Sequence, residues 1–141
     1  MSGIVKKMKL SFKILKNIDL VYEYLTDMKK FVSVHPVISQ INNISDESYI
    51  VHETLKFGPI PFSFSYPVTI EKDAAKKKII IRAKVYKMTK IEMQFVLKSE
   101  NNYTIIEEEI EFKSLLPIES LMQRIFKEQH MQLFKNIEAV K

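Results

Sequence analysis

Apolar and polar residues alternate with a period of two along most of this chain, the pattern of a half-buried β-strand. The alternation is clear in Lys7–Lys16, where Met8, Leu10 and Phe12 share one face. It resumes at Ile38 and continues to Lys113, broken only by polar turns. Pro67 cannot donate to a strand ladder, so we expect a bulge or a bend there. The predicted strands are Lys7–Lys16, Ile38–Asp46 (weak, at an edge), Tyr49–Phe57, Phe62–Glu71, Ile79–Val85, Ile91–Leu97 and Tyr103–Lys113.

Three segments have a helical pattern instead. Asn17 is a suitable N-cap for a short helix that ends at about Asp27, and a second short helix over Lys29–Val37 stops at His35-Pro36. The third helix is long, with Pro117 in its first turn and its end near Lys141. One apolar stripe runs along it: Ile118, Met122, Ile125, Phe126, Leu133, Ile137 and Val140. Gln129 interrupts the centre of that stripe, so a polar group faces the surface that the helix covers.

Four segments resemble the START-like, SRPBCC superfamily of helix-grip proteins: "KNIDLVYEYLTDM", "FVSVHPVI", "VHETLKFGPIPFSFSYPVTIE" and "YTIIEEEIEFKSLLPI". The resemblance extends over essentially the whole chain. It implies an α+β fold of order β-α-α-β6-α, in which a curved seven-stranded antiparallel sheet wraps around the long C-terminal helix. It also implies an apolar cavity between sheet and helix. Relatives include polyketide cyclases and dehydratases and lipid-transfer domains, whereas the pollen-allergen branch is disfavoured because its glycine-rich loop is missing here.

Length and composition limit the number of domains and exclude several kinds of chemistry and partner. A chain of 141 residues is expected to form one domain, residues 1–141. No cysteine is present, which excludes disulfides and thiolate chemistry. The net charge of +5 comes almost entirely from lysines spread along strand faces, so we expect no nucleic-acid partner. Neither a signal peptide in Met1–Leu10 nor a transmembrane segment is predicted, and we expect a cytoplasmic protein.

Two carboxylates interrupt the apolar faces of predicted strands. Glu53 lies between Val51 and Leu55, and Glu108 shares a face with Ile106 and Ile110. A buried carboxylate is costly unless it is paired or hydrated. Each could be a polar group in a ligand cavity opposite Gln129, or it could reach the sheet rim or be turned outward by a bulge.

The three histidines point to no metal site. His35 is expected at a helix end and His52 on the wet face of its strand. His130 is expected at the edge of the helix stripe, where it could touch a cavity mouth, although we favour a packing role. Their spacing does not bring ligands together at short intervals. No cofactor is expected.

Three functions are compatible with this pattern. The first is a binding protein that carries or sequesters an apolar small molecule or lipid, and this is the function we favour. The second is a cyclase- or dehydratase-type enzyme acting on an apolar carbonyl substrate, with Glu53 or Glu108 transferring a proton. The third is an interaction module with a filled core; a homodimer is possible in any of these. The expected cavity residues are Phe62, Phe64, Tyr66, Glu53, Glu108, Ile110, Met93, Phe95, Met122, Ile125, Phe126, Gln129 and Leu133.

Overall fold

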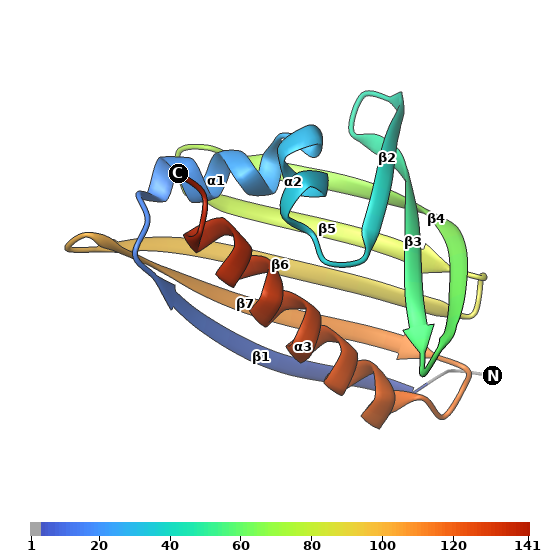
Figure 1. The fold of residues 1–141 in the computed structure, drawn as a ribbon. Coiled ribbons are helices and arrows are strands. Elements are labelled where there is room, and N and C mark those ends of the chain that lie inside the picture. Colours follow the sequence, from blue (N-terminus) through green and yellow to red (C-terminus); the bar gives the residue numbers. More distant parts are fainter. Residues whose placement is uncertain (1–3) are drawn as a thin grey trace.

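The computed structural model describes residues 4–141, so the first three residues of the segment analysed for a signal peptide lie outside it. Seven strands and three helices follow one another in the predicted order (Figure 1). Their bounds are β1 Ile4–Ile14, α1 Ile18–Thr26, α2 Met28–Val34, β2 Ile38–Ser45, β3 Ser48–Phe57, β4 Ile60–Asp73, β5 Lys78–Val85, β6 Thr89–Glu100, β7 Tyr103–Ser114 and α3 Glu119–Glu138.

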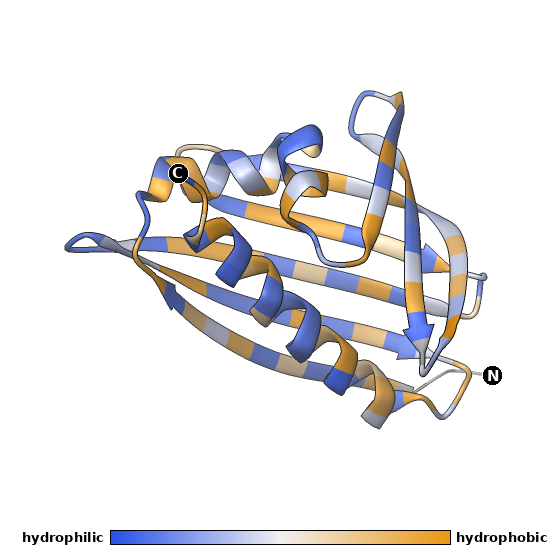
Figure 2. Cartoon of the chain, viewed as in Figure 1, coloured by the Kyte–Doolittle hydropathy of each residue, from blue (hydrophilic) through white to orange (hydrophobic). Residues whose placement is uncertain are grey.

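All seven strands form one antiparallel sheet in the order β1-β7-β6-β5-β4-β3-β2. The sheet curves, and α3 crosses its concave face while α1 and α2 lie beside the C-terminal end of α3 (Figure 1). The predicted helix-grip architecture is therefore confirmed. Hydrophobic and hydrophilic positions alternate along the strands that pass behind α3 (Figure 2), because one face meets the helix and the other meets water.

The edge strand β2 is irregular. Its pairing with β3 shifts between Ile38 and Gln40 and again between Asn43 and Ser45. Such irregularities make an exposed strand edge a poor template for pairing with another chain. This agrees with the prediction of a weak strand at the edge of the sheet.

Pro67 causes no bulge, because β3 and β4 pair without a register shift through Ile50 and Pro67. A bulge or a bend was predicted at Pro67, and the bulge is therefore wrong. The β4–β5 ladder begins one residue later, at Val68 and Ala83, and β4 curves away from β5 on the other side of that point (Figure 1). Proline lacks the N–H that another ladder bond would require. The β3–β4 hairpin thus extends beyond the rest of the sheet.

Side-chain caps fix the two short helices. Asn17 Oδ1 accepts a hydrogen bond from the Asp19 backbone N–H at 2.8 Å, as the N-cap prediction requires. Asp27 ends α1 and also caps α2, since its Oδ1 accepts from the backbone N–H groups of Lys29 and Lys30. The α2 helix ends at Val34, with His35 as its C-cap.

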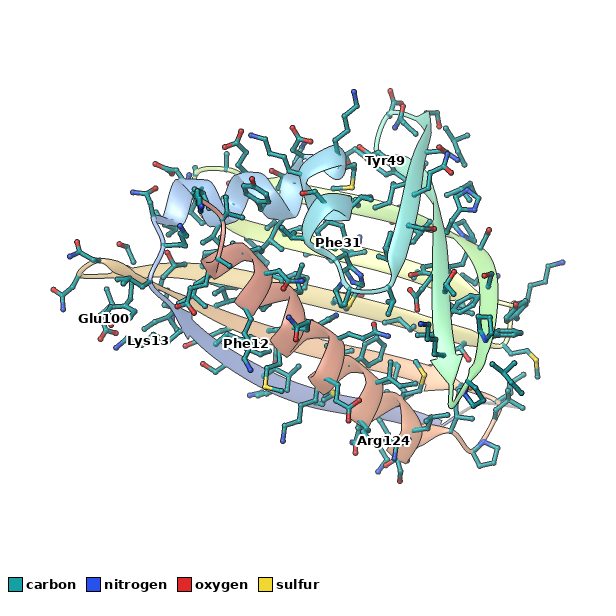
Figure 3. All side chains as sticks on the ribbon, viewed as in Figure 1. Phe12, Lys13, Phe31, Tyr49, Glu100 and Arg124 are labelled. Atoms are coloured by element: carbon teal, nitrogen blue, oxygen red, sulfur yellow. The ribbon has the colours of Figure 1, made fainter. Side chains whose placement is uncertain are left out.

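The two halves of α3 differ in how closely they pack. The helix begins at Glu119, so the prediction of Pro117 in its first turn is wrong: Pro117 precedes the N-cap residue Ile118. The C-terminal half is tightly packed, with Phe134 and Ile137 almost completely buried, and the ring centroids of Phe134 and Phe12 lie 4.8 Å apart. Figure 3 labels Phe12, on the strand that runs beside α3. Met122 and Ile125, in the N-terminal half, are only half-buried. The C-terminal half of α3 therefore packs closely on the sheet, whereas Met122 and Ile125 in its N-terminal half pack less closely.

Replacing Leu133 by Asp should destabilise the fold severely. Leu133 is 1% exposed, and an unpaired charge buried there should cost about 3 kcal/mol or more. Met131→Asp is the matched control, because Met131 lies on the outer face of the same helix and is 42% exposed. Urea unfolding followed by circular dichroism measures both; equal stability of the two variants would contradict the packing described.

Candidate functional site

An apolar cavity of about 310 Å³ lies between the N-terminal half of α3 and the concave face of the sheet. Side chains of α2, β2 to β6 and α3 form its walls. Most are aliphatic, aromatic or methionine side chains, including Phe31, Val51, Phe64, Ile81, Met93, Phe95, Met122, Ile125, Phe126 and Leu133. Such walls favour an apolar occupant.

The cavity opens at one end of the molecule. Three lining side chains are largely exposed, namely Tyr86 at 60%, Met88 at 39% and Leu116 at 43%. Tyr86 and Met88 belong to the β5–β6 turn, and Leu116 belongs to the β7–α3 connection; both lie at the same end of the sheet (Figure 1). Residues that both line the cavity and face solvent mark its mouth.

Glu108 and His130 form a buried pair at the centre of the sheet–helix interface. Glu108 pairs in register with Leu10 on one side and Phe95 on the other, and it is 1% exposed. His130 Nδ1 lies 2.8 Å from Oε1 and 2.6 Å from Oε2, of which only the first contact has hydrogen-bond geometry. No other group within residues 4–141 hydrogen-bonds to this carboxylate. This hydrogen bond therefore fixes the position of α3 relative to β7.

The ring of His130 also belongs to the cavity wall. His130 is 4% exposed and lines the cavity, with Phe95 and Phe126 rings packed on it at centroid distances of 6.0 Å and 5.8 Å. Its Nδ1 is occupied by Glu108, and no hydrogen bond to Nε2 occurs among the described residues. The ring thus brings one unpaired polar atom to an apolar wall.

His35 also lines the cavity, from the end of α2. Its Nδ1 accepts hydrogen bonds from the backbone N–H groups of Val37 at 3.2 Å and Ile38 at 3.1 Å. Burial, with a smaller effect of the positive charge of His130, lowers the pKa of His35 to about 3. The ring is therefore neutral near pH 7, and because Nδ1 is an acceptor the ring proton lies on Nε2.

Glu53 and Tyr66 form a third polar group, on neighbouring strands. The Tyr66 hydroxyl donates to Glu53 Oε1 at 2.7 Å, and both residues line the cavity. Burial raises the pKa of Glu53 above its usual value, although the Tyr66 hydrogen bond and the charge of His130 act in the opposite direction. Burial and the Glu53 charge raise the pKa of Tyr66 well above its usual value.

Most of the sequence-predicted cavity residues lie in its wall. Those that line it are Phe64, Tyr66, Glu53, Met93, Phe95, Met122, Ile125, Phe126, Gln129 and Leu133. Three do not. Phe62 is 46% exposed on the protruding β3–β4 hairpin, Ile110 is buried in the packed core, and Glu108 lies behind His130.

The sequence reasoning missed the roles of two histidines. His130 was expected at the edge of the helix stripe, in a packing role or at a cavity mouth, whereas it is buried, lines the cavity and holds Glu108. The available signal was helical spacing, because His130 follows the buried Phe126 by four residues. His35 was correctly placed at a helix end, but its contact with the cavity follows from the path of α2 across the sheet. His52 lies on the outer face as expected, next to Ser65 and Asn42.

Within the described part of the chain, no three His, Cys, Asp or Glu side chains come together in an arrangement that could hold a metal ion. Over the same residues, no helix has the length and hydrophobicity needed to cross a membrane.

Comparisons with known proteins agree with this geometry. The family model for CoxG, a carbon monoxide dehydrogenase component, matches residues 11–139. A comparison with curated proteins finds no match. Among solved structures, Ara h 8.0201 is similar with a TM-score of 0.78 and 14% identity, covering 96% of each chain. A START superfamily protein from Mycobacterium smegmatis gives a TM-score of 0.76 and 11% identity over 94% of each chain.

The Zhui aromatase/cyclase from Streptomyces sp. R1128 is similar with a TM-score of 0.71 and 12% identity, covering 96% of this chain and 92% of that one. At such low identity these structures show a shared fold only. They confirm the START-like, SRPBCC-type architecture that the sequence resembles.

Glu53→Gln should change how stability depends on pH. Well below pH 4.5, its usual pKa, Glu53 is neutral in the folded and the unfolded state. As pH rises, the unfolded chain ionises first, so wild-type stability falls until pH passes the raised folded pKa. The variant keeps an acceptor for Tyr66 but does not titrate. Its stability advantage over wild type should therefore grow from pH 4 upward and then level off.

Urea unfolding between pH 4 and pH 8 measures this difference, with Glu47→Gln as the control at an exposed position. A difference between E53Q and wild type that stays constant over this range, or that shrinks as pH rises, would show that Glu53 is not desolvated.

Proposed function

The chain belongs to the CoxG family of carbon monoxide dehydrogenase components, and from that membership and the cavity we propose that it binds an apolar small molecule or lipid. The bound molecule would occupy the space between α3 and the sheet. The protein would act as a carrier of this molecule or would sequester it.

One observation carries this proposal, namely that the N-terminal half of α3 does not close onto the sheet. The space left there is about 310 Å³, within the range of roughly 300–1,000 Å³ that is usual for ligand pockets. Its walls are almost entirely apolar, so transferring a hydrophobic molecule from water into it is favourable. An interaction module with a filled core would not contain a cavity of this size.

The mouth supplies a route for the ligand. Tyr86, Met88 and Leu116 are exposed at the opening, and such side chains can contact an apolar molecule as it enters. They belong to a turn and a connection, which can move more readily than the strands. A ligand could thus enter and leave without separation of α3 from the sheet.

The cyclase or dehydratase alternative is less well supported by the geometry. Glu108 does not line the cavity and is already paired with His130, so it cannot itself exchange a proton with a bound molecule. Glu53 does line the cavity, but one of its oxygens accepts from Tyr66. We therefore favour binding without a chemical step.

Phe64→Arg should abolish binding of the apolar dye N-phenyl-1-naphthylamine. Phe64 is half-buried in the cavity wall, where its ring lies 5.7 Å from the Tyr66 ring and 6.1 Å from the Tyr86 ring. A guanidinium at this position would place charge in the binding space. Fluorescence titration should give saturable binding near one molecule per chain for wild type and none for the variant.

The matched control is Phe62→Arg, on the same strand but outside the cavity wall, which should bind the dye as wild type does. Circular dichroism checks that both variants are folded. Failure of folded wild type to bind the dye, or unchanged affinity in F64R, would reject the proposed site.

A further inference from the structure

The cavity is apolar except for a small set of groups contributed by His35, His130, Gln129, the Glu53–Tyr66 pair, Thr89, whose hydroxyl is paired with Ser114, and Tyr86 at the mouth. The two histidines are notable because in each ring one nitrogen is already occupied by the protein. Which atom each ring then presents to the cavity follows from hydrogen-bond valence.

The buried Glu108–His130 pair determines the state of His130. We take the pair to be electrically balanced, because a net charge at this depth would cost several kcal/mol; if instead a Glu108 carboxylate accepted from the Nδ1–H of a neutral His130, Nε2 would be an acceptor. Two balanced states exist. In the ion pair, both nitrogens of His130 carry protons; in the neutral pair, the carboxyl proton of Glu108 is donated to Nδ1, and the single ring proton lies on Nε2. In both balanced states Nε2 is therefore an N–H donor, on a residue that lines the cavity.

His35 also has an N–H donor at Nε2, for a different reason. Its Nδ1 accepts from two backbone N–H groups, so its proton lies on Nε2. His35, His130 and Glu53 all line the same cavity. Two N–H donors thus border the same cavity, and neither has an acceptor among the described residues.

A donor in an apolar wall gains about 0.5–1.5 kcal/mol when a ligand supplies its acceptor. A ligand group that accepts hydrogen bonds and donates none would provide this gain. Such a group should also be neutral, because the charge of His130 is already balanced by Glu108, and Glu53 lines the cavity as well. A carbonyl oxygen meets these conditions, whereas a carboxylate or an ammonium group does not.

We propose that the cavity selects apolar molecules that carry a neutral carbonyl group, whose oxygen accepts a hydrogen bond from His130 Nε2–H with His35 Nε2–H as a second donor. Ketones and esters are the chemical classes that fit. This inference rests on the proposed function, since it requires that the cavity binds a ligand.

The test uses two probes that differ in one atom group. The ketone 2-acetylnaphthalene and the hydrocarbon 2-isopropenylnaphthalene have the same planar skeleton, with an oxygen in the first where the second has a CH₂ group. Dissociation constants for both are measured by displacement of N-phenyl-1-naphthylamine. An infrared spectrum of the ¹³C-labelled ketone reports directly on hydrogen bonding to its oxygen.

Asparagine is the informative replacement for both histidines. In His130→Asn the side-chain N–H can still donate to Glu108, but nothing replaces Nε2. In His35→Asn the side-chain oxygen can still accept from the Val37 and Ile38 N–H groups, again without Nε2. His52→Asn, on the outer face, is the control. Circular dichroism verifies folding, and H35N together with the wild-type infrared spectrum keeps the test decisive if H130N does not fold.

H130N should weaken ketone binding by about tenfold or more, and H35N by about threefold, while hydrocarbon binding stays unchanged. The carbonyl band of the ketone should move to lower frequency in wild type and return in H130N. Binding of both probes with no effect of H130N or H35N, and no band shift, would overturn the inference and leave the proposed function intact. Binding of neither probe to folded wild type would reject both.

Discussion

A carboxylate at the centre of an apolar sheet face must find a partner, and the position of α3 follows from that requirement. Glu108 is supplied by the middle of β7, and its partner is His130 on the helix. From this contact onward, the C-terminal half of α3 packs closely, with Phe134 against Phe12. Before it, the helix forms one wall of the cavity, and side chains of β3 and β4 form part of the other. The same contact therefore aligns the helix and ends the packed core where the cavity begins.

The architecture could be predicted because local signals agreed with one another. Alternation marked each strand, Asn17 provided a cap, and one apolar stripe identified the helix that covers the sheet. The predictions that failed concern positions where two signals compete. Pro67 can interrupt a ladder on either side of its strand, and only the pairing with β5 is affected. Pro117 suits a first helical turn, but the helix begins after Ile118.

The site was harder to predict because it depends on which residues of distant elements face each other. Alternation correctly indicated that Glu108 points inward, but not that His130 would meet it, since sequence does not give the register of a helix on a sheet. Phe62 shares the inward face of β4 in sequence, yet it remains exposed because its hairpin extends beyond the other strands. The tautomer of His35 depends on backbone N–H groups that converge only after α2 ends.

The central claim is that the space between the N-terminal half of α3 and the sheet admits an apolar molecule. The methionines of this chain test it directly by NMR of ¹³C-labelled methyl groups during titration with 2-isopropenylnaphthalene. Met28, Met93 and Met122 line the cavity, whereas Met131 is exposed on the outer face of α3. We expect saturable shifts and ligand contacts at Met93 on the sheet and Met122 on the helix, with Met131 unchanged. Shifts confined to Met131, or none at Met93 and Met122, would contradict the account.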